Sequence, residues 1–221
     1  MATAAICSGN GTNFLSRYKG TPYGDSRIMA APQQIPGVVY FAYYDRGGEG
    51  VAYHDSDALN NGSNSTLNPA NRSYLSEFRR HEGVDVSYTM MGREPKIDDS
   101  PYNKVTPPAD LLYVGWTVPG EWFNLTVQAA ETGNYAGDLL FTSNRGGTIA
   151  IDVNGEPATG ALALPSTANA ADPIVWRQWH HWSVAQRLVR LHLNAGRNVL
   201  TVHIVSEGQM NLAFLAFRSA A

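Results

Sequence analysis

The chain carries one β-strand pattern after another, and this series constrains the fold more than any other feature. Residues 148–153 alternate apolar and polar side chains, and Asn154-Gly155 follows them as a strong hairpin signal. Residues 198–205 alternate in the same way, after a short loop at 194–197. No segment shows a convincing helical pattern. We therefore predict an all-β fold, a β-sandwich or jelly roll of about ten strands. The strand patterns fall at 38–44, 51–55, 84–88, 111–116, 122–129, 136–143, 148–153, 188–193, 198–205 and 210–217.

Length and composition agree with this fold and exclude some partners. The 221 residues suffice for one domain with a sizeable core. Charged residues make up only 16%, and 21 glycines and 12 prolines suit short strands joined by turns. The formal net charge of -3 shows no excess of Lys or Arg, so we expect neither nucleic acid nor a membrane surface as a partner.

The N-terminal part differs from the remainder of the chain. Residues 1–34 are rich in Gly, Ser, Asn, Thr and Pro without a sustained period, which predicts a linker or lead-in segment before a sandwich domain at 35–221. The first residues show no secretion signal. Cys7 is the one cysteine, which excludes an intramolecular disulfide and a zinc site built from cysteines.

The segment 174–184 holds three of the five tryptophans. If it forms a strand, Trp182 and Trp179 point to opposite faces, and the ordinary expectation for both is packing in the core or at its rim. Trp176 follows a loop and stands beside Arg177 and Gln178, so it combines a flat apolar face with polar neighbours. This combination favours stacking on a sugar ring.

Two other groups of residues are candidates for chemistry. His180 and His181 are adjacent, so on a strand they point to opposite faces and are unsuited to sharing a metal ion. A glycosidase needs two carboxyl groups about 5 to 10 Å apart. Acidic residues in one loop region could supply them, although such residues also form turns. These residues are Glu49, Asp55, Asp57 and Glu82.

Several segments together resemble the family-six carbohydrate-binding modules, over roughly residues 35–218. These modules are β-jelly rolls, usually attached to secreted glycoside hydrolases, and they hold glycans in a cleft formed by loops. The resemblance therefore implies a carbohydrate-binding module. The matching segments are Ile35-Pro36-Gly37, Tyr44-Asp45, 47–55 (GGEGVAYHD), Glu82-Gly83-Val84-Asp85, Val114-Gly115-Trp116-Thr117, Gly120-Glu121-Trp122 and Asn211-Leu212.

Site residues follow from the resemblance, segment by segment. In the family an aromatic pair clamps a sugar, and here the pair corresponds to Trp176 and Phe78. An asparagine and an acidic residue read the hydroxyl groups, and they correspond to Asn211 and Glu49. Phe78 replaces the more usual tyrosine, and residues 64–77 before it look like an insertion beside the cleft.

This chain departs from the family's pattern at the structural calcium site. Family members commonly supply two glutamates on the first strand and an aspartate near the last, where this chain has Tyr40, Ala42 and Ala213. Calcium needs six or more oxygen ligands and prefers carboxylates. We therefore expect no calcium at this place, with apolar packing instead, and we expect no other metal or cofactor.

The sequence thus favours a non-catalytic module that binds a plant or microbial polysaccharide of β-glucan or xylan type. Through the resemblance, it would target an attached glycoside hydrolase outside the cell. Two alternatives stay open: a glycoside hydrolase or lyase that uses the loop carboxylates, and a protein-interaction sandwich with an occluded cleft. The particular glycan, the oligomeric state and any second site on the concave sheet face also stay open.

Overall fold

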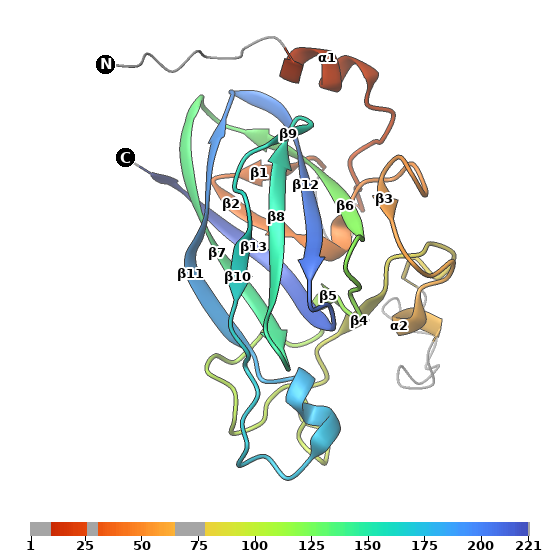
Figure 1. Ribbon diagram of the computed structural model, residues 1–221, viewed down its shortest axis with the longest axis vertical. Coiled ribbons are helices and arrows are strands. Elements are labelled where there is room, and N and C mark those ends of the chain that lie inside the picture. Colours follow the sequence, from red (N-terminus) through yellow and green to blue (C-terminus); the bar gives the residue numbers. More distant parts are fainter. Residues whose placement is uncertain (1–9, 26–30, 65–77, 221) are drawn as a thin grey trace.

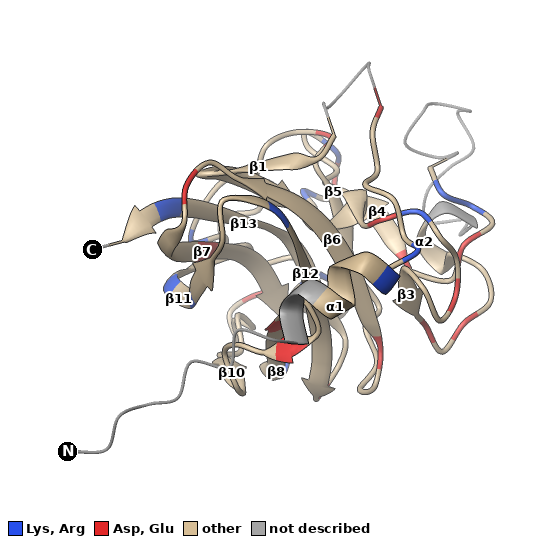
Figure 2. Cartoon of the chain, turned by 90° about the horizontal axis from the view of Figure 1, so that it is seen from above, with Lys and Arg blue, Asp and Glu red and all other residues tan. Residues whose placement is uncertain are grey.

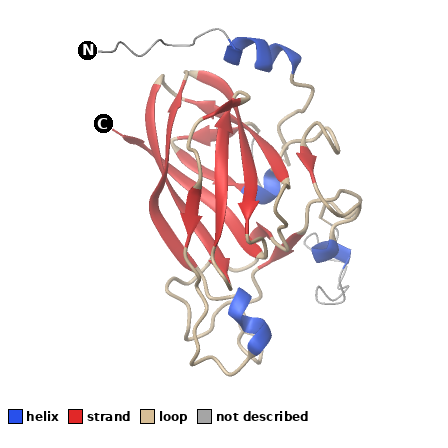
Figure 3. Ribbon diagram, viewed as in Figure 1, coloured by secondary structure: helices blue, strands red, loops and turns tan. Residues whose placement is uncertain are grey.

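The structure is a computed structural model that describes residues 10–25, 31–64 and 78–220 of the chain. Two β-sheets pack face to face with the hydrophobic core between them (Figure 1). Strands dominate the described chain and helices are few and short (Figure 3). This arrangement confirms the predicted all-β sandwich.

The first sheet runs in the order β1, β6, β12, β8, β10, with β3 also paired to β6 and β9 to β8. Its centre is β12, where Leu200 lies opposite Leu125 on one side and Val153 on the other. The alternating pattern that predicted β8 and β12 thus places apolar side chains on the core face. The strands are β1 (Gln33–Ile35), β3 (Tyr53–His54), β6 (Trp122–Ala129), β8 (Gly147–Val153), β9 (Glu156–Pro157), β10 (Leu162–Leu164) and β12 (Gly196–Ser206).

The second sheet runs in the order β11, β7, β13, β5, β4, with β2 also paired to β13. β13 has a register shift between Leu212 and Phe214 where it pairs with β7. Asn211, just before that irregularity, lies beside the short strand β5 at one end of the sandwich, since Leu212 pairs with Val114. The strands are β2 (Gly37–Tyr40), β4 (Val86–Tyr88), β5 (Leu112–Val114), β7 (Gly133–Ser143), β11 (Ser183–Leu193) and β13 (Met210–Ala220).

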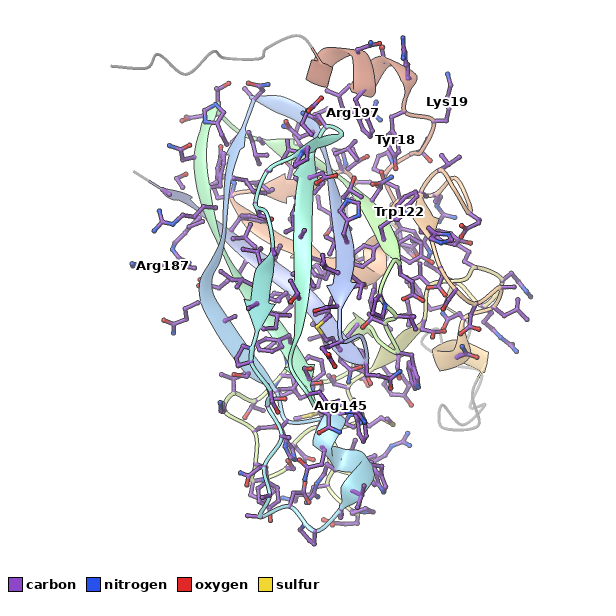
Figure 4. All side chains as sticks on the ribbon, viewed as in Figure 1. Tyr18, Lys19, Trp122, Arg145, Arg187 and Arg197 are labelled. Atoms are coloured by element: carbon purple, nitrogen blue, oxygen red, sulfur yellow. The ribbon has the colours of Figure 1, made fainter. Side chains whose placement is uncertain are left out.

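The prediction that the chain has no helix was wrong for α1 (Asn10–Arg17). Its sequence contains weak helix formers, so tertiary contacts stabilise it instead. The Phe14 ring lies against the hairpin at Gly155, and the Tyr18 hydroxyl donates to Asp45 at 2.7 Å. Tyr18, Lys19 and Trp122 of β6 line a common hollow of about 380 Å³ (Figure 4). Helix α1 and the residues directly after it therefore pack on the first sheet.

Three shorter helical turns also lie in the described ranges: α2 (Asn61–Asn64) and the 3-10 turns η1 (Phe41–Tyr43) and η2 (Val175–Trp179). η1 ends the strand expected at 38–44 after Tyr40. Residues 65–77, most of the expected insertion, lie outside the described residues. No helix in the described ranges is both long and apolar enough to cross a membrane.

The three positions that the resemblance assigns to calcium ligands lie in the core or against it. Ala42 and Ala213 are fully buried. Tyr40 is partly buried, and its ring packs edge-on against Phe214 at 5.6 Å between centroids. Ala213 shares a hydrophobic cluster with Trp182. Apolar and aromatic groups thus fill these positions.

Candidate functional site

A pocket of about 280 Å³ opens where β5 ends, β13 begins and η2 folds over the end of the sandwich. η2 is the light-blue helix beyond the lower end of the sheets in Figure 1. The lining is mostly aromatic, and among the residues that the structure describes it includes no Lys, Arg, Asp or Glu. Such a pocket suits a ligand with apolar faces and no charge. Its lining residues are Tyr113, Trp116, Trp176, Trp179, His180, Gln209 and Asn211.

Three of the seven lining residues are tryptophans. Trp176 on η2 is 47% exposed, and its ring meets His180 edge-on at 6.0 Å between centroids. Trp179, one turn further on, and Trp116, after β5, are half-buried. Trp116 has a φ of 50°, a left-handed conformation that bulky residues rarely adopt. Backbone strain of this kind clusters at binding sites, where the surrounding structure holds it in place.

Asn211 supplies a polar group at the base of the pocket. Its side chain is almost buried, at 6% exposure, and Nδ2 donates to the carbonyl of Trp179 at 2.6 Å. This bond fixes the amide orientation and leaves Oδ1 as the group that can accept a hydrogen bond. Gly115 lies next to Oδ1, because a Cβ atom there would stand 2.8 Å from it.

Asp98 holds the back of the pocket in place. This fully buried carboxylate accepts from the indole Nε1 of Trp182 at 2.7 Å and from the backbone N–H of Met90 at 2.7 Å. The ring of His180 adds a third bond, with Nδ1 2.9 Å from Asp98 Oδ1. The irregular stretch around residue 98 therefore positions a pocket residue that is distant in sequence.

Asp172 is a second buried carboxylate that organises the tryptophan segment. Arg177 binds it through Nε and Nη2, at 2.6 and 2.7 Å, and His181 Nε2 lies 2.7 Å away. Arg177 also donates to the carbonyl of Lys96 at 2.7 Å. The hydrogen bonds from Arg177 hold the pKa of Asp172 well below its usual range. These bonds close 172–181 into a compact turn.

This turn corrects the prediction of a strand through the tryptophan segment. η2 occupies Val175–Trp179 and β11 begins only at Ser183. Trp182 is fully buried, as expected for a core residue, but Trp179 lines the pocket. The adjacent histidines His180 and His181 bind different carboxylates, in agreement with the expectation that they point apart.

The structure brings two of the four candidate sugar-binding residues together. Trp176 and Asn211 line the same pocket. Glu49 lies elsewhere: it contacts His54 Nδ1 at 2.5 Å, accepts from the backbone of Asp55 at 3.1 Å, and lines a separate hollow of about 370 Å³. Glu49 is therefore not part of the aromatic pocket.

The resemblance implied that Phe78 is part of the aromatic clamp, but in the structure Phe78 is a core residue. Phe78 is only 3% exposed, and its ring packs against Tyr23 at 5.6 Å and Tyr43 at 5.8 Å. The neighbouring Arg79 fastens this segment through hydrogen bonds to the backbone of Asp45 and to Glu82. A ring buried in this way has no free face for a sugar, so the second aromatic wall comes from Trp116 and Trp179 instead.

Sequence reasoning missed Trp116, Trp179 and His180 as pocket residues. Trp116 was visible as an aromatic residue directly after a strand and a glycine, a position at which rings often line loop clefts. Trp179 is expected in the core or at its rim because tryptophan is highly buried on average, whereas in the structure it lines the pocket. No local signal places His180 in the pocket, since its orientation depends on Asp98.

The hollow around Glu49 contains the carboxylates considered for catalysis. Glu49, Asp55 and Asp57 line it, whereas Glu82 is bound to Arg79 outside it. Figure 2 shows acidic residues along the loops around β3 and α2. Burial raises the pKa of Asp55 to about 7, with a further rise from Glu121. At neutral pH, Asp55 is thus protonated in about half of the molecules.

Comparison with known proteins gives structural similarities only. No family model matches the chain, and no curated protein matches it. A family 35 carbohydrate-binding module from Clostridium thermocellum is similar, with 22% identity and a TM-score of 0.41 over 53% of this chain and 84% of the other. The carbohydrate-binding module CBM6cm-2 from Cellvibrio mixtus lichenase 5A, in complex with cellotriose, has 22% identity and a TM-score of 0.40, over 50% of this chain and 79% of the other.

The C-terminal CBM6 of LamC from Zobellia galactanivorans is similar to the same degree, with 21% identity and a TM-score of 0.40 over 49% of this chain and 80% of the other. Similarities this low do not carry over a function, which has to come from the residues of the pocket.

Proposed function

We propose that this chain is a non-catalytic carbohydrate-binding module that holds an uncharged polysaccharide, of β-glucan or xylan type, in the aromatic pocket. One observation carries the proposal: Trp116, Trp176 and Trp179 converge on one pocket with Asn211 at its base. Sugar rings present apolar C–H faces that stack on indoles and hydroxyl groups that bind amides. The pocket supplies both kinds of contact.

The described residues of the pocket lining carry no charged side chain, which supports an uncharged ligand. A sugar carboxylate or sulfate would lose its hydration against the indole rings without gaining a Lys or Arg partner. Such a penalty disfavours acidic glycans. As the resemblance of residues 35–218 implies, the proposal extends to attachment to a secreted glycoside hydrolase, which the module would bring to its polysaccharide outside the cell.

Affinity gels and calorimetry with neutral polysaccharides test this function. The wild type should bind with micromolar to millimolar affinity, and Trp176→Ala should weaken binding at least about tenfold, equal to 1.4 kcal/mol. Val175→Ala is the matched control, because Val175 is 77% exposed on the same turn but does not line the pocket. Equal binding by wild type and Trp176→Ala would rule out this pocket as the binding site.

A second candidate function is glycoside hydrolysis at the Glu49 hollow. The pKa of Asp55, raised to about 7, favours it, because a general acid must hold its proton near neutral pH. Purified protein would then release reducing sugar from a polysaccharide, and both Glu49→Gln and Asp55→Asn would abolish that release. If no reducing sugar appears from a polysaccharide that the protein binds, the hollow is not a hydrolase site.

A further inference from the structure

We infer that His180 is a further ligand-binding residue, whose Nε2 accepts a hydrogen bond from one sugar hydroxyl while Asn211 Oδ1 accepts from another. The inference rests on the proposed function and makes it more specific. The pocket would then require two free hydroxyl groups on the bound sugar, in addition to a ring face for stacking.

The tautomer of His180 follows from its partner. Asp98 accepts hydrogen bonds from two N–H donors whose direction is fixed, Trp182 Nε1 and the Met90 backbone. It therefore acts as an acceptor toward His180 as well, and Nδ1 is the donor across their 2.9 Å contact. In a neutral imidazole with the proton on Nδ1, Nε2 carries a lone pair.

The position of His180 in the pocket lining makes that lone pair available to a ligand. The ring lines the pocket and stands edge-on to Trp176, and its side chain is 16% exposed. Within the described ranges, Nε2 makes no hydrogen bond, and it is not among the buried polar atoms that lack one. Nε2 is thus an accessible acceptor on a ring that lines the pocket.

Asn211 provides a second acceptor in the pocket lining, and its orientation is fixed in the same way. Donation from Nδ2 to Trp179 fixes the amide, and Oδ1 makes no hydrogen bond among the described residues. The pocket therefore has two acceptors whose orientation is set by bonds at their other ends. A hydroxyl is the sugar group that donates to such acceptors, and a methyl ether in its place leaves both acceptors desolvated and unpaired.

The first test compares ligands. Mixed-linkage β-glucan, laminarin, xylan and agarose are screened by affinity gel, and the one that the wild type binds is tested again as its O-methylated derivative. The derivative keeps the ring faces but has lost the hydroxyl donors, so binding should fall at least about tenfold. Equal binding of the derivative, or no binding of any of the four, would overturn the inference.

The second test compares variants. His180→Phe keeps a ring in the pocket and removes the acceptor, and we expect it to weaken binding about fivefold to thirtyfold. His180→Gln restores a carbonyl acceptor and should recover part of the loss. His192→Phe is the control, since His192 is exposed on β11 and bonded to Asn134 outside the pocket.

A spectroscopic readout separates ligand contact from a structural role. The ¹⁵N signal of His180 Nε2 should move on saturation with the bound polysaccharide's oligosaccharide, whereas a residue that only supports the fold would keep its signal. If Trp176→Ala abolishes binding but His180→Phe binds like wild type and the signal does not move, the proposed function stands and this inference fails.

Discussion

Asp172 is the residue on which the tryptophan segment depends most directly. It is 5% exposed and bonds with both Arg177 and His181. Asp172→Ala leaves the buried guanidinium of Arg177 without its anion, so we expect a loss of about 3 to 5 kcal/mol in the free energy of unfolding. Urea unfolding measures it.

An exposed ion pair gives the control for this variant. Asp138 binds Arg218 on the surface, where solvent screens the interaction, so Asp138→Ala should change the urea midpoint little. Equal destabilisation by the two variants would show that Asp172 does not hold the turn.

Gly115 keeps the acceptor of Asn211 open to the pocket. A Cβ atom at residue 115 would lie 2.8 Å from Asn211 Oδ1 and 3.3 Å from the ring of Tyr113. We expect Gly115→Ala to weaken glycan binding severalfold in calorimetry while the near-UV circular dichroism stays native, because the amide is held by its bond to Trp179. Gly133→Ala, where a Cβ meets nothing within 4 Å, should bind like wild type.

Among the elements, α1 depends on its end contact with the sandwich. The Tyr18 hydroxyl donates to Asp45, a buried carboxylate that also accepts from Thr126. Tyr18→Phe removes one of these bonds, and we expect a loss of about 1 to 2 kcal/mol in stability together with faster hydrogen exchange at residues 13–17. Tyr102→Phe, which loses an exposed bond to a backbone carbonyl, should cost less. Unchanged exchange in α1 would contradict this role of Tyr18.

Elements with a strong local pattern were predictable from the sequence, and elements held by distant contacts were not. β6 appears at 122–129, as its β-branched and aromatic residues predicted. α1 and η2 were missed because Asp45 and Asp172 stabilise them, rather than their own sequences. The strands β9 and β10 have two and three residues, too few for an alternating pattern to show.

The candidate site was predictable to the same limited degree. The resemblance implied that Trp176 and Asn211 share one pocket, and both line it in the structure. It placed Phe78 there as well, since an aromatic residue after a long loop looks the same whether it is buried or exposed. His180 joins the pocket through a bond to Asp98, 82 residues away, which no local pattern reveals.

At the scale of the whole molecule, the buried carboxyls set the pH dependence of stability. Burial raises the pKa of Asp55 to about 7 and that of Asp85 to about 6. The folded state therefore binds more protons than the unfolded state above about pH 4, so stability falls as the pH rises from about 4 to 7.

Asp172 acts in the opposite direction, because its pKa is lowered. The stability that Asp172 contributes is present above about pH 4, and it is lost as the pH falls toward the pKa of Asp172 in the folded state. We expect maximum thermal stability near pH 4 to 5, and a flatter decline toward pH 7 in Asp55→Asn. Melting curves from pH 3 to 8 measure both, and stability that rises between pH 4 and 7 would contradict the assignment.

The measurement that tests the central claim most directly is an indole ¹H–¹⁵N spectrum during titration with a neutral oligosaccharide. The five tryptophans give five signals, assigned by Trp→Phe variants. If the aromatic pocket binds the sugar, the signals of Trp116, Trp176 and Trp179 move together, while those of Trp122 and the core residue Trp182 stay in place. If saturating sugar leaves the three pocket signals unmoved, the aromatic pocket is not the carbohydrate site.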